Sequence, residues 1–242
     1  MNALEIRGLT KRRGDFALQG LDLTLPAGCI MGLIGENGAG KSTTIRLILN
    51  ALSRDGGTVA VYGKDNRALT PLAREDIGAV LDEVGLPEYM TARQIGRMMA
   101  GIFARWQPEV YRGYLRRLAL PEDKPFRDFS RGMKMKLGLA AALSHQPKLL
   151  LLDEATSGLD PVVRDEILTI FADFTRDEEH AVLISSHIVS DLEKICDYIA
   201  FLHKGRLLLC EEKDRLTEEY GILRGGTDGI APAAVCGRHA TP

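Results

Sequence analysis

Alternating and continuous apolar stretches divide most of the chain into predicted strands and helices. Apolar and polar residues alternate at 4–9 ("LEIRGL") and 21–25 ("LDLTL"), a pattern typical of strands with one exposed face. Continuous apolar runs at 29–35 ("CIMGLIG") and 148–153 ("KLLLLD") predict buried strands. The shorter runs "TVAVYG", "IGAVL" and "AVLISS" predict three more, and "YIAFLHKGRLLLC" predicts two strands around a Lys-Gly turn.

Helical spacing separates these strands. It appears in "KSTTIRLILNAL", in "VVRDEILTIFADF" and in "IVSDLEKIC". Strands that alternate with helices predict an α/β fold with a parallel sheet. Between about 86 and 130 the pattern is helical only, and a stripe of Met98, Met99, Ile102 and Phe103 is predicted to fill a core there.

This interruption predicts the domain organisation. The core is expected over 1–85 and 145–215, with a helical subdomain inserted over 86–144. Residues 216–242 are expected to form a C-terminal tail. Its Gly- and Ala-rich end lacks periodicity, and it is predicted to be flexible after residue 224.

Composition excludes some classes of partner. Of 242 residues, 31 are Lys or Arg and 33 are Asp or Glu, so the net charge of −2 gives no basic excess, and no nucleic-acid partner is predicted. No run reaches the roughly 18 apolar residues of a membrane span, and the first residues lack the apolar stretch of a signal peptide. We therefore expect a cytoplasmic protein that reaches a membrane only through a partner.

The stretch "GENGAGKST" carries the phosphate-loop pattern G-x-x-x-x-G-K-[ST] between a buried strand and a helix. Glycines let successive backbone N–H groups face phosphate oxygens, and the helix amino terminus adds partial positive charge. Lys41 is expected to reach the β- and γ-phosphates, and the Ser42 hydroxyl to bind Mg²⁺. The alternative is a glycine-rich turn that binds nothing. The predicted nucleotide-binding residues are Gly35, Glu36, Asn37, Gly38, Ala39, Gly40, Lys41, Ser42 and Thr43.

A pair of acids ends the strand "KLLLLD". Asp153 falls at its carboxyl end, where open α/β sheets bind ligands, and it is expected to hold Mg²⁺ through water. Glu154 follows, placed to polarise the water that attacks the γ-phosphate. The alternative is an acid pair that merely faces solvent.

Two further residues are candidates with structural alternatives. His187 follows the strand "AVLISS", which should lie near the strand of Asp153, so its imidazole could contact the γ-phosphate or orient water. A histidine in this place is often structural instead. Asp160 precedes Pro161 and a helix, and could serve as its N-cap rather than as a functional residue.

In their order and spacing these motifs, with "FSRGM" and "SSH", resemble the nucleotide-binding subunits of ABC transporters over about residues 3–215. The resemblance is strongest to exporter-type subunits whose membrane part is a separate chain. It implies a P-loop NTPase core with an N-terminal antiparallel β part and the inserted helical subdomain. It also implies ATP and Mg²⁺ as cofactors, with Lys41, Glu154 and His187 catalytic and Asp160 in the segment called the D-loop.

The resemblance explains "FSRGM". In the family this signature binds the γ-phosphate held by a second subunit, in a head-to-tail dimer that encloses two ATP molecules. Here the residues are Ser130, Arg131, Gly132 and Met133, where the family commonly has Ser-Gly-Gly-Gln. A hydroxyl and an unobstructed N–H at a helix start suit an anion. The structural alternative is an N-cap serine in a basic surface turn.

The chain departs from the family at three other places. Asp82 stands where a magnesium-binding Gln is usual, so it is expected to couple the core to the insert and to ligate Mg²⁺. Arg13 stands where an aromatic residue usually stacks on adenine; a guanidinium can stack on a base, and Phe16 is the alternative. Ala155 replaces a common proline.

The implied partners are a transmembrane permease on a separate chain and a second ATPase subunit, identical or paralogous. The protein would then lie on the inner face of the cell membrane, and the insert would receive the permease. Trp106, Tyr111 and Tyr114 either form the insert's core or contact that partner. Three other functions stay open: a soluble ABC ATPase acting on a protein assembly, a GTP switch, and a nucleotide-binding module without turnover.

Overall fold

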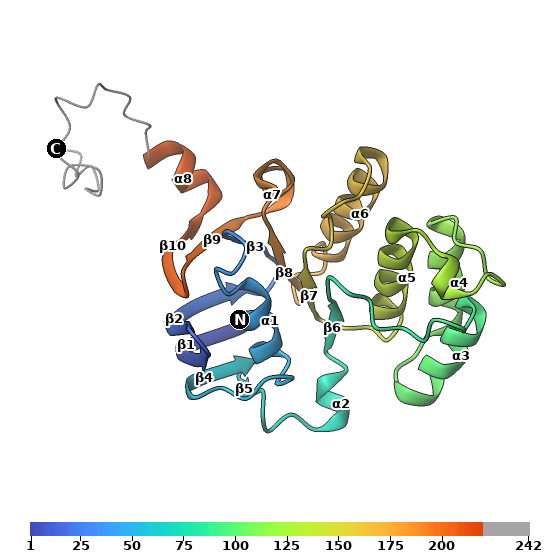
Figure 1. Cartoon of the computed structure of the whole chain (residues 1–242), viewed down its shortest axis with the longest axis horizontal. Coiled ribbons are helices and arrows are strands. Elements are labelled where there is room, and N and C mark those ends of the chain that lie inside the picture. The colour runs from blue at the N-terminus through green and yellow to red at the C-terminus, as the bar shows by residue number, and fades with distance from the viewer. Residues whose placement is uncertain (220–242) are drawn as a thin grey trace.

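The computed structural model describes residues 1–219; the tail prediction for residues after 224 lies outside them. Two sheets and several helices make up the described part (Figure 1). Within it, the strands are β1 Asn2–Arg13, β2 Phe16–Pro26, β3 Ile30–Ile34, β4 Gly56–Val61, β5 Lys64–Asp65, β6 Ile77–Val80, β7 Leu149–Asp153, β8 Ala181–Ser186, β9 Tyr198–His203 and β10 Arg206–Glu212. The helices are α1 Lys41–Ile48, α2 Pro71–Arg74, α3 Ala92–Ile102, α4 Pro108–Arg117, α5 Arg131–Leu143, α6 Pro161–Phe174, α7 Val189–Ile195 and α8 Lys213–Glu219, with a 3₁₀ turn at Phe126–Asp128.

The larger sheet has the strand order β10-β9-β3-β8-β7-β6. Its strands run parallel except β10, which pairs antiparallel with β9. Successive strand residues point to opposite faces, and two hydrophobic cores result. Leu150 and Leu152 pack into the core shared with α3, α4, α5 and α6, while Leu149 and Leu151 pack into the core shared with α1 and the smaller sheet. This burial on both faces explains the continuous apolar run of β7.

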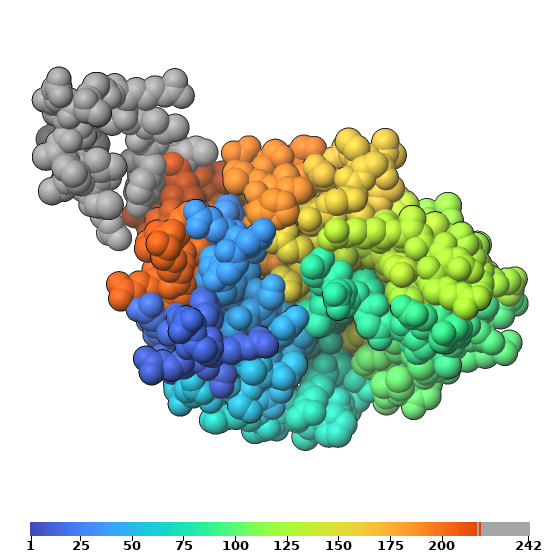
Figure 2. Space-filling view, in the orientation of Figure 1, coloured from blue at the N-terminus to red at the C-terminus, as the bar shows by residue number. Residues whose placement is uncertain are grey.

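The smaller sheet is antiparallel, with the order β2-β1-β4-β5. One face of β1 and β2 is buried and the other exposed, as the alternating pattern predicts. The arrangement is an α/β core with a parallel sheet, an antiparallel β part and a group of helices, which confirms the predicted fold class. Figure 1 shows β1, β2, β4 and β5 on one side of the large sheet and α3, α4 and α5 on the other. In Figure 2 these helices form the green lobe of the surface.

The helical segment has an aromatic core. Trp106 and Tyr111 are buried with ring centroids 5.1 Å apart, and Tyr114 packs partly buried against the same cluster. This favours core filling over partner contact for these rings. The predicted stripe is wrong at Ile102, which is 62% exposed, and at Met98, which is not among the residues packed against the core. The helix ends at Ile102, so the chain turns and only Met99 and Phe103 reach the core. The domain bounds 86–144 stay a prediction.

A small polar cluster links the helices to the sheet. The Glu75 carboxylate accepts hydrogen bonds from the backbone N–H groups of Ala104 and Arg105, just beyond α3, at 2.7 and 2.9 Å. His145, just beyond α5, donates from Nδ1 to the Glu75 carbonyl oxygen over 3.1 Å and stacks on the Phe103 ring at 4.2 Å. Burial lowers the pKa of His145 below its ordinary value, so the imidazole is neutral here.

This neutral imidazole predicts a pH dependence of stability. Below about pH 6.5 the unfolded chain binds a proton at His145 more readily than the folded chain does, so the free energy of unfolding falls as pH drops through that range. Urea unfolding at pH 7.5 and 5.5 should show a larger loss for the wild type than for His145→Phe. Equal losses in the two proteins would contradict the assignment. The charged groups around the ring are the Glu75 carboxylate and the Arg105 guanidinium.

Candidate functional site

The phosphate loop leaves β3 and enters α1 through two glycines in the left-handed region, Gly38 with φ of 82° and Gly40 with φ of 113°. At Gly40 a Cβ atom would lie 2.8 Å from the Phe16 ring, so only glycine fits without a shift. The Lys41 ammonium, buried at the helix start, donates to the Gly35 carbonyl oxygen at 2.6 Å and to that of Glu36 at 3.4 Å. The loop therefore curls around its own lysine.

The first acid of the pair lies beside this loop. Asp153 ends β7, and the residue is 2% exposed. The Ser42 hydroxyl donates to Asp153 Oδ1 over 3.1 Å, which joins the first turn of α1 to the end of β7. A serine hydroxyl beside a buried carboxylate is the kind of oxygen donor set that Mg²⁺ uses together with phosphate oxygens. The residues present thus fit the predicted ion.

The second acid contacts both of the other predicted catalytic residues. Glu154 has φ of 53°, so the chain turns sharply after β7 and aims the side chain back at the loop. Its Oε1 atom lies 3.2 Å from Lys41 Nζ, and its Oε2 atom lies 2.7 Å from His187 Nδ1. The Glu154 side chain is 14% exposed and that of His187 51%. Glu154 therefore stands between a buried cation and a half-exposed imidazole.

Ser185 is a residue that the sequence reasoning missed. It lies in β8, between β3 and β7, and is fully buried. Its hydroxyl donates to Asp153 Oδ1 at 2.7 Å and accepts the backbone N–H of Glu154 at 3.0 Å. One hydroxyl thus fixes both acids. The available signal was its place in "SSH", two residues before His187 at the end of a strand adjacent to that of Asp153.

Lys41, Ser42 and Glu154 line a pocket of about 370 Å³, whereas Asp153, Ser185 and His187 are not among its lining residues. Asp82, which follows β6, reaches it from the other side of β7, and Arg13 and Phe16 reach it from the β1–β2 hairpin. Arg13 is exposed, whereas Phe16 is partly buried against the loop. The lining residues are Arg13, Phe16, Glu36, Asn37, Gly38, Gly40, Lys41, Ser42, Thr43, Asp82 and Glu154.

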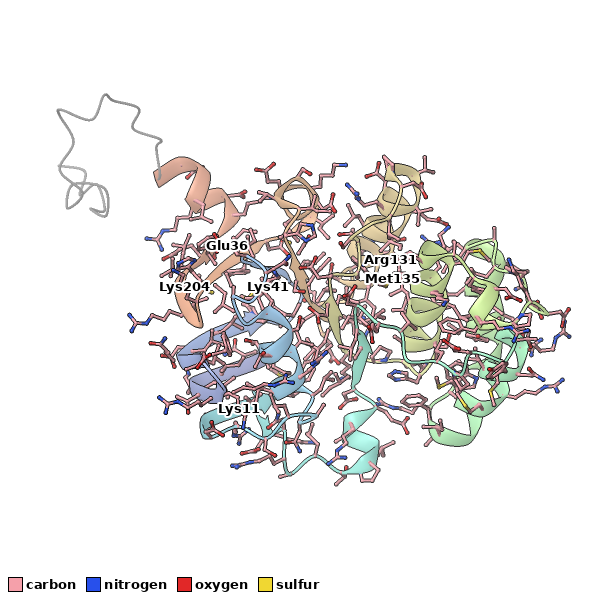
Figure 3. The ribbon with its side chains drawn as sticks, viewed as in Figure 1. Lys11, Glu36, Lys41, Arg131, Met135 and Lys204 are labelled. Carbon is pink, nitrogen blue, oxygen red and sulfur yellow. The ribbon has the colours of Figure 1, made fainter. Side chains whose placement is uncertain are left out.

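Of the signature residues, only Arg131 reaches the pocket edge, where Nη2 donates to Asp82 Oδ1 at 2.9 Å. Ser130 caps α5, and its hydroxyl accepts the Met133 N–H at 3.3 Å, as the structural alternative expected. Asp160 similarly caps α6 by accepting the Val163 N–H at 3.1 Å. Figure 3 shows Lys41 on α1 and Arg131 on α5, with central strands of the large sheet between them. Within residues 1–219, Ser130, Gly132, Met133 and Asp160 are not among the residues that line the pocket.

Comparisons with known proteins agree with this geometry. The family model described as "ABC transporter" matches residues 18–157. An uncharacterized ABC transporter ATP-binding protein of Bacillus subtilis, YhcH, is 36% identical over 85% of this chain and 68% of its own length. The bacitracin transport ATP-binding protein BcrA of Enterococcus faecalis is 32% identical over 85% and 68%. A solved ATP-binding subunit of an ABC transporter superimposes with a TM-score of 0.81 at 26% identity, covering 88% of this chain and 91% of that one.

The contacts of Ser185 predict its effect on stability. Ser185→Ala removes one donor from a buried carboxylate, and we expect the free energy of unfolding to fall by about 1–3 kcal/mol. Urea denaturation measures the loss. A Ser185→Ala protein as stable as the wild type would show that these two hydrogen bonds do not fix the acids.

Proposed function

Because this chain belongs to the ABC transporter family, as an ATP-binding protein, we propose that it binds and hydrolyses ATP, dimerises around two Mg-ATP and drives a separate transmembrane permease. The observation that carries hydrolysis is the contact of Glu154 with both Lys41 and His187 at the phosphate loop. A carboxylate so placed can act as a base toward water beside the terminal phosphate.

The phosphates would replace protein contacts that the loop makes with itself. Lys41 is held by carbonyl oxygens and by Glu154 in this structure. A triphosphate in the loop offers Lys41 a stronger set of acceptors, since charge-assisted bonds to phosphate are among the strong ones. Glu154 is then free to accept a proton from water, and His187 orients that water and the γ-phosphate.

Magnesium would be held by Ser42 and by Asp153 through water, with Asp82 at the same edge of the pocket. When bound, the ion neutralises charge on the β- and γ-phosphates. Ser185 keeps the Asp153 carboxylate oriented toward the first turn of α1. The backbone N–H groups of 35–43 complete the phosphate contacts.

Adenine would lie over the β1–β2 hairpin. We propose Arg13 as the stacking residue, because it is exposed and lines the pocket, whereas the Phe16 ring is partly buried against Gly40. A guanidinium plane stacks on a base without strict selectivity. Phe16 remains the alternative if base stacking needs an aromatic ring.

The proposed dimer would give the start of helix α5 a phosphate to bind, which its own chain does not offer it. Ser130 and Gly132 lie at the start of α5 and are not among the residues that line the chain's own pocket. A helix amino terminus attracts an anion, and in a two-fold head-to-tail pair each start would face the triphosphate of the other copy. We propose Ser130, Arg131, Gly132 and Met133 as these contacts, with Asp160 beside them. The second copy is identical or a paralogue.

A membrane partner is supported by the relatives' names. BcrA is named for bacitracin transport, and we propose transport by export for this chain because its motifs resemble those of exporter-type subunits. Within residues 1–219 no helix has the length and apolar content that a membrane span requires. The location we propose is the cytoplasmic face of the membrane, at the permease, because the relatives are ATP-binding proteins of transport systems. The helices over 86–144 are proposed to receive the permease.

Glu154→Gln tests the chemistry. Loss of the base should lower kcat for ATP hydrolysis by on the order of 10²–10⁴, while ATP still binds and the protein accumulates as an ATP-dependent dimer. Phosphate release and size-exclusion chromatography with light scattering measure the two effects. Glu178→Gln, an exposed acid before β8 at the opposite sheet edge, is the matched control and should behave as wild type. Hydrolysis at the wild-type rate in Glu154→Gln would remove Glu154 from this role.

A further inference from the structure

Arg131 and Asp82 form an ion pair between the signature helix and the edge of the nucleotide pocket. Arg131 Nη2 donates to Asp82 Oδ1 at 2.9 Å, and the two side chains are 55% and 53% exposed. Asp82 lines the pocket together with Lys41, Ser42 and Glu154. The pair thus spans the two halves of a site that the proposed dimer would complete between chains, yet it lies within one chain.

Asp82, the partner of Arg131, brings negative charge to a pocket that is proposed to hold a triphosphate. Asp82 adds this charge to the carboxylates of Asp153 and Glu154 at the same sheet edge. A like charge near phosphate disfavours binding, and an adjacent guanidinium offsets it. Arg131 therefore masks a repulsive charge in the nucleotide-free chain.

The Arg131 side chain extends so that its guanidinium lies close to Gly158, in the segment after β7. At Gly158, with φ of 69°, an added Cβ atom would lie 3.2 to 3.5 Å from three guanidinium atoms of Arg131. Arg131 thus passes over a glycine between Glu154 and Asp160. A side chain at position 158 would require the guanidinium to shift by a few tenths of an ångström.

The strength of the pair suits an exchangeable contact. Ion pairs between half-exposed side chains change an equilibrium constant by only about 1.4- to 5-fold. A guanidinium bound to phosphate oxygens can form two parallel, charge-assisted hydrogen bonds, which are much stronger. A triphosphate presented to the start of α5 would therefore draw Arg131 away from Asp82.

We propose that Arg131 is an exchanging arginine: it binds Asp82 of its own chain without nucleotide and the triphosphate of the second copy in the ATP-bound dimer. This proposal rests on the proposed function, because it requires that dimer. In the dimer, Arg131 contacts the nucleotide of the second copy. Before that, its bond to Asp82 holds α5 against the chain's own pocket and so opposes formation of the dimer. Each closing dimer breaks two such pairs.

A double-mutant cycle in the Glu154→Gln background tests the exchange. The measured quantity is the ATP concentration that gives half-maximal dimer, by light scattering, for the parent, Asp82→Asn, Arg131→Gln and the double variant. Arg131→Gln should raise that concentration by on the order of tenfold, because a charged phosphate contact is lost. Asp82→Asn also removes a proposed Mg²⁺ ligand. By itself it can therefore raise or lower the ATP concentration that gives half-maximal dimer.

The coupling between the two substitutions is the decisive result. Asp82→Asn should favour dimerisation about 1.4- to 5-fold more in the chain that keeps Arg131 than in the Arg131→Gln chain, since only in the former does it remove a pair that closure must break. Arg127→Gln, an exposed arginine four residues earlier that pairs with Asp128, is the matched control and should show no coupling to Asp82. Nucleotide-free thermal unfolding checks that all variants fold.

Two failures are distinguishable. A Glu154→Gln parent that stays monomeric with Mg-ATP overturns the proposed function, and the exchange with it. A parent that dimerises while Asp82→Asn has the same effect in both backgrounds overturns the exchange alone. Arg131→Gln with an unchanged ATP requirement would likewise show that Arg131 does not reach the second copy's triphosphate.

Discussion

The site depends on the contact between Lys41 and Glu154, which joins two strands that are not neighbours. The phosphate loop leaves β3 and the acids leave β7, with β8 between them. Because these strands are parallel, their carboxyl ends meet at one edge, and the 3.2 Å ion pair closes the gap across β8. Ser185 and His187, at the end of β8, contact the same acids. With another strand order the phosphate loop and the two acids would not lie in contact.

The balance of charges at this sheet edge distinguishes nucleotide binding by one chain from dimerisation of two chains. Lys41 and Arg131 each neutralise a carboxylate in the nucleotide-free chain, Glu154 and Asp82 respectively. In the proposed dimer a triphosphate would compete for both cations. On this proposal the buried Lys41 needs only a ligand in its own loop, whereas the half-exposed Arg131 needs a ligand brought by the second copy. Binding and dimerisation are therefore expected to be linked through the same anion.

Much of this could be predicted from the sequence, because the strands and the loop carry strong local patterns. The apolar run of β7 and the loop at 35–43 fix their own structures, and the order of strands and helices implies the parallel sheet. Contacts between distant segments could not be predicted: the Ser185 hydroxyl and the Arg131–Asp82 pair arise from strand order and helix packing, over 32 and 49 residues of sequence separation. Helical periodicity places Ile102 on the core stripe, but periodicity does not show where a helix ends, and α3 ends at this residue.

The central claim is that each site is built from the loop of one copy and the α5 start of the other. Mixing two variants tests it most directly: Lys41→Ala, which keeps the α5 start, and Gly132→Asp, which keeps the loop, both with Glu154→Gln. Each variant alone has no complete site, but a mixed pair has one. We expect labelled ATP to be trapped only after mixing, at about one per dimer. Trapping by either variant alone, or none in mixed dimers, would contradict it.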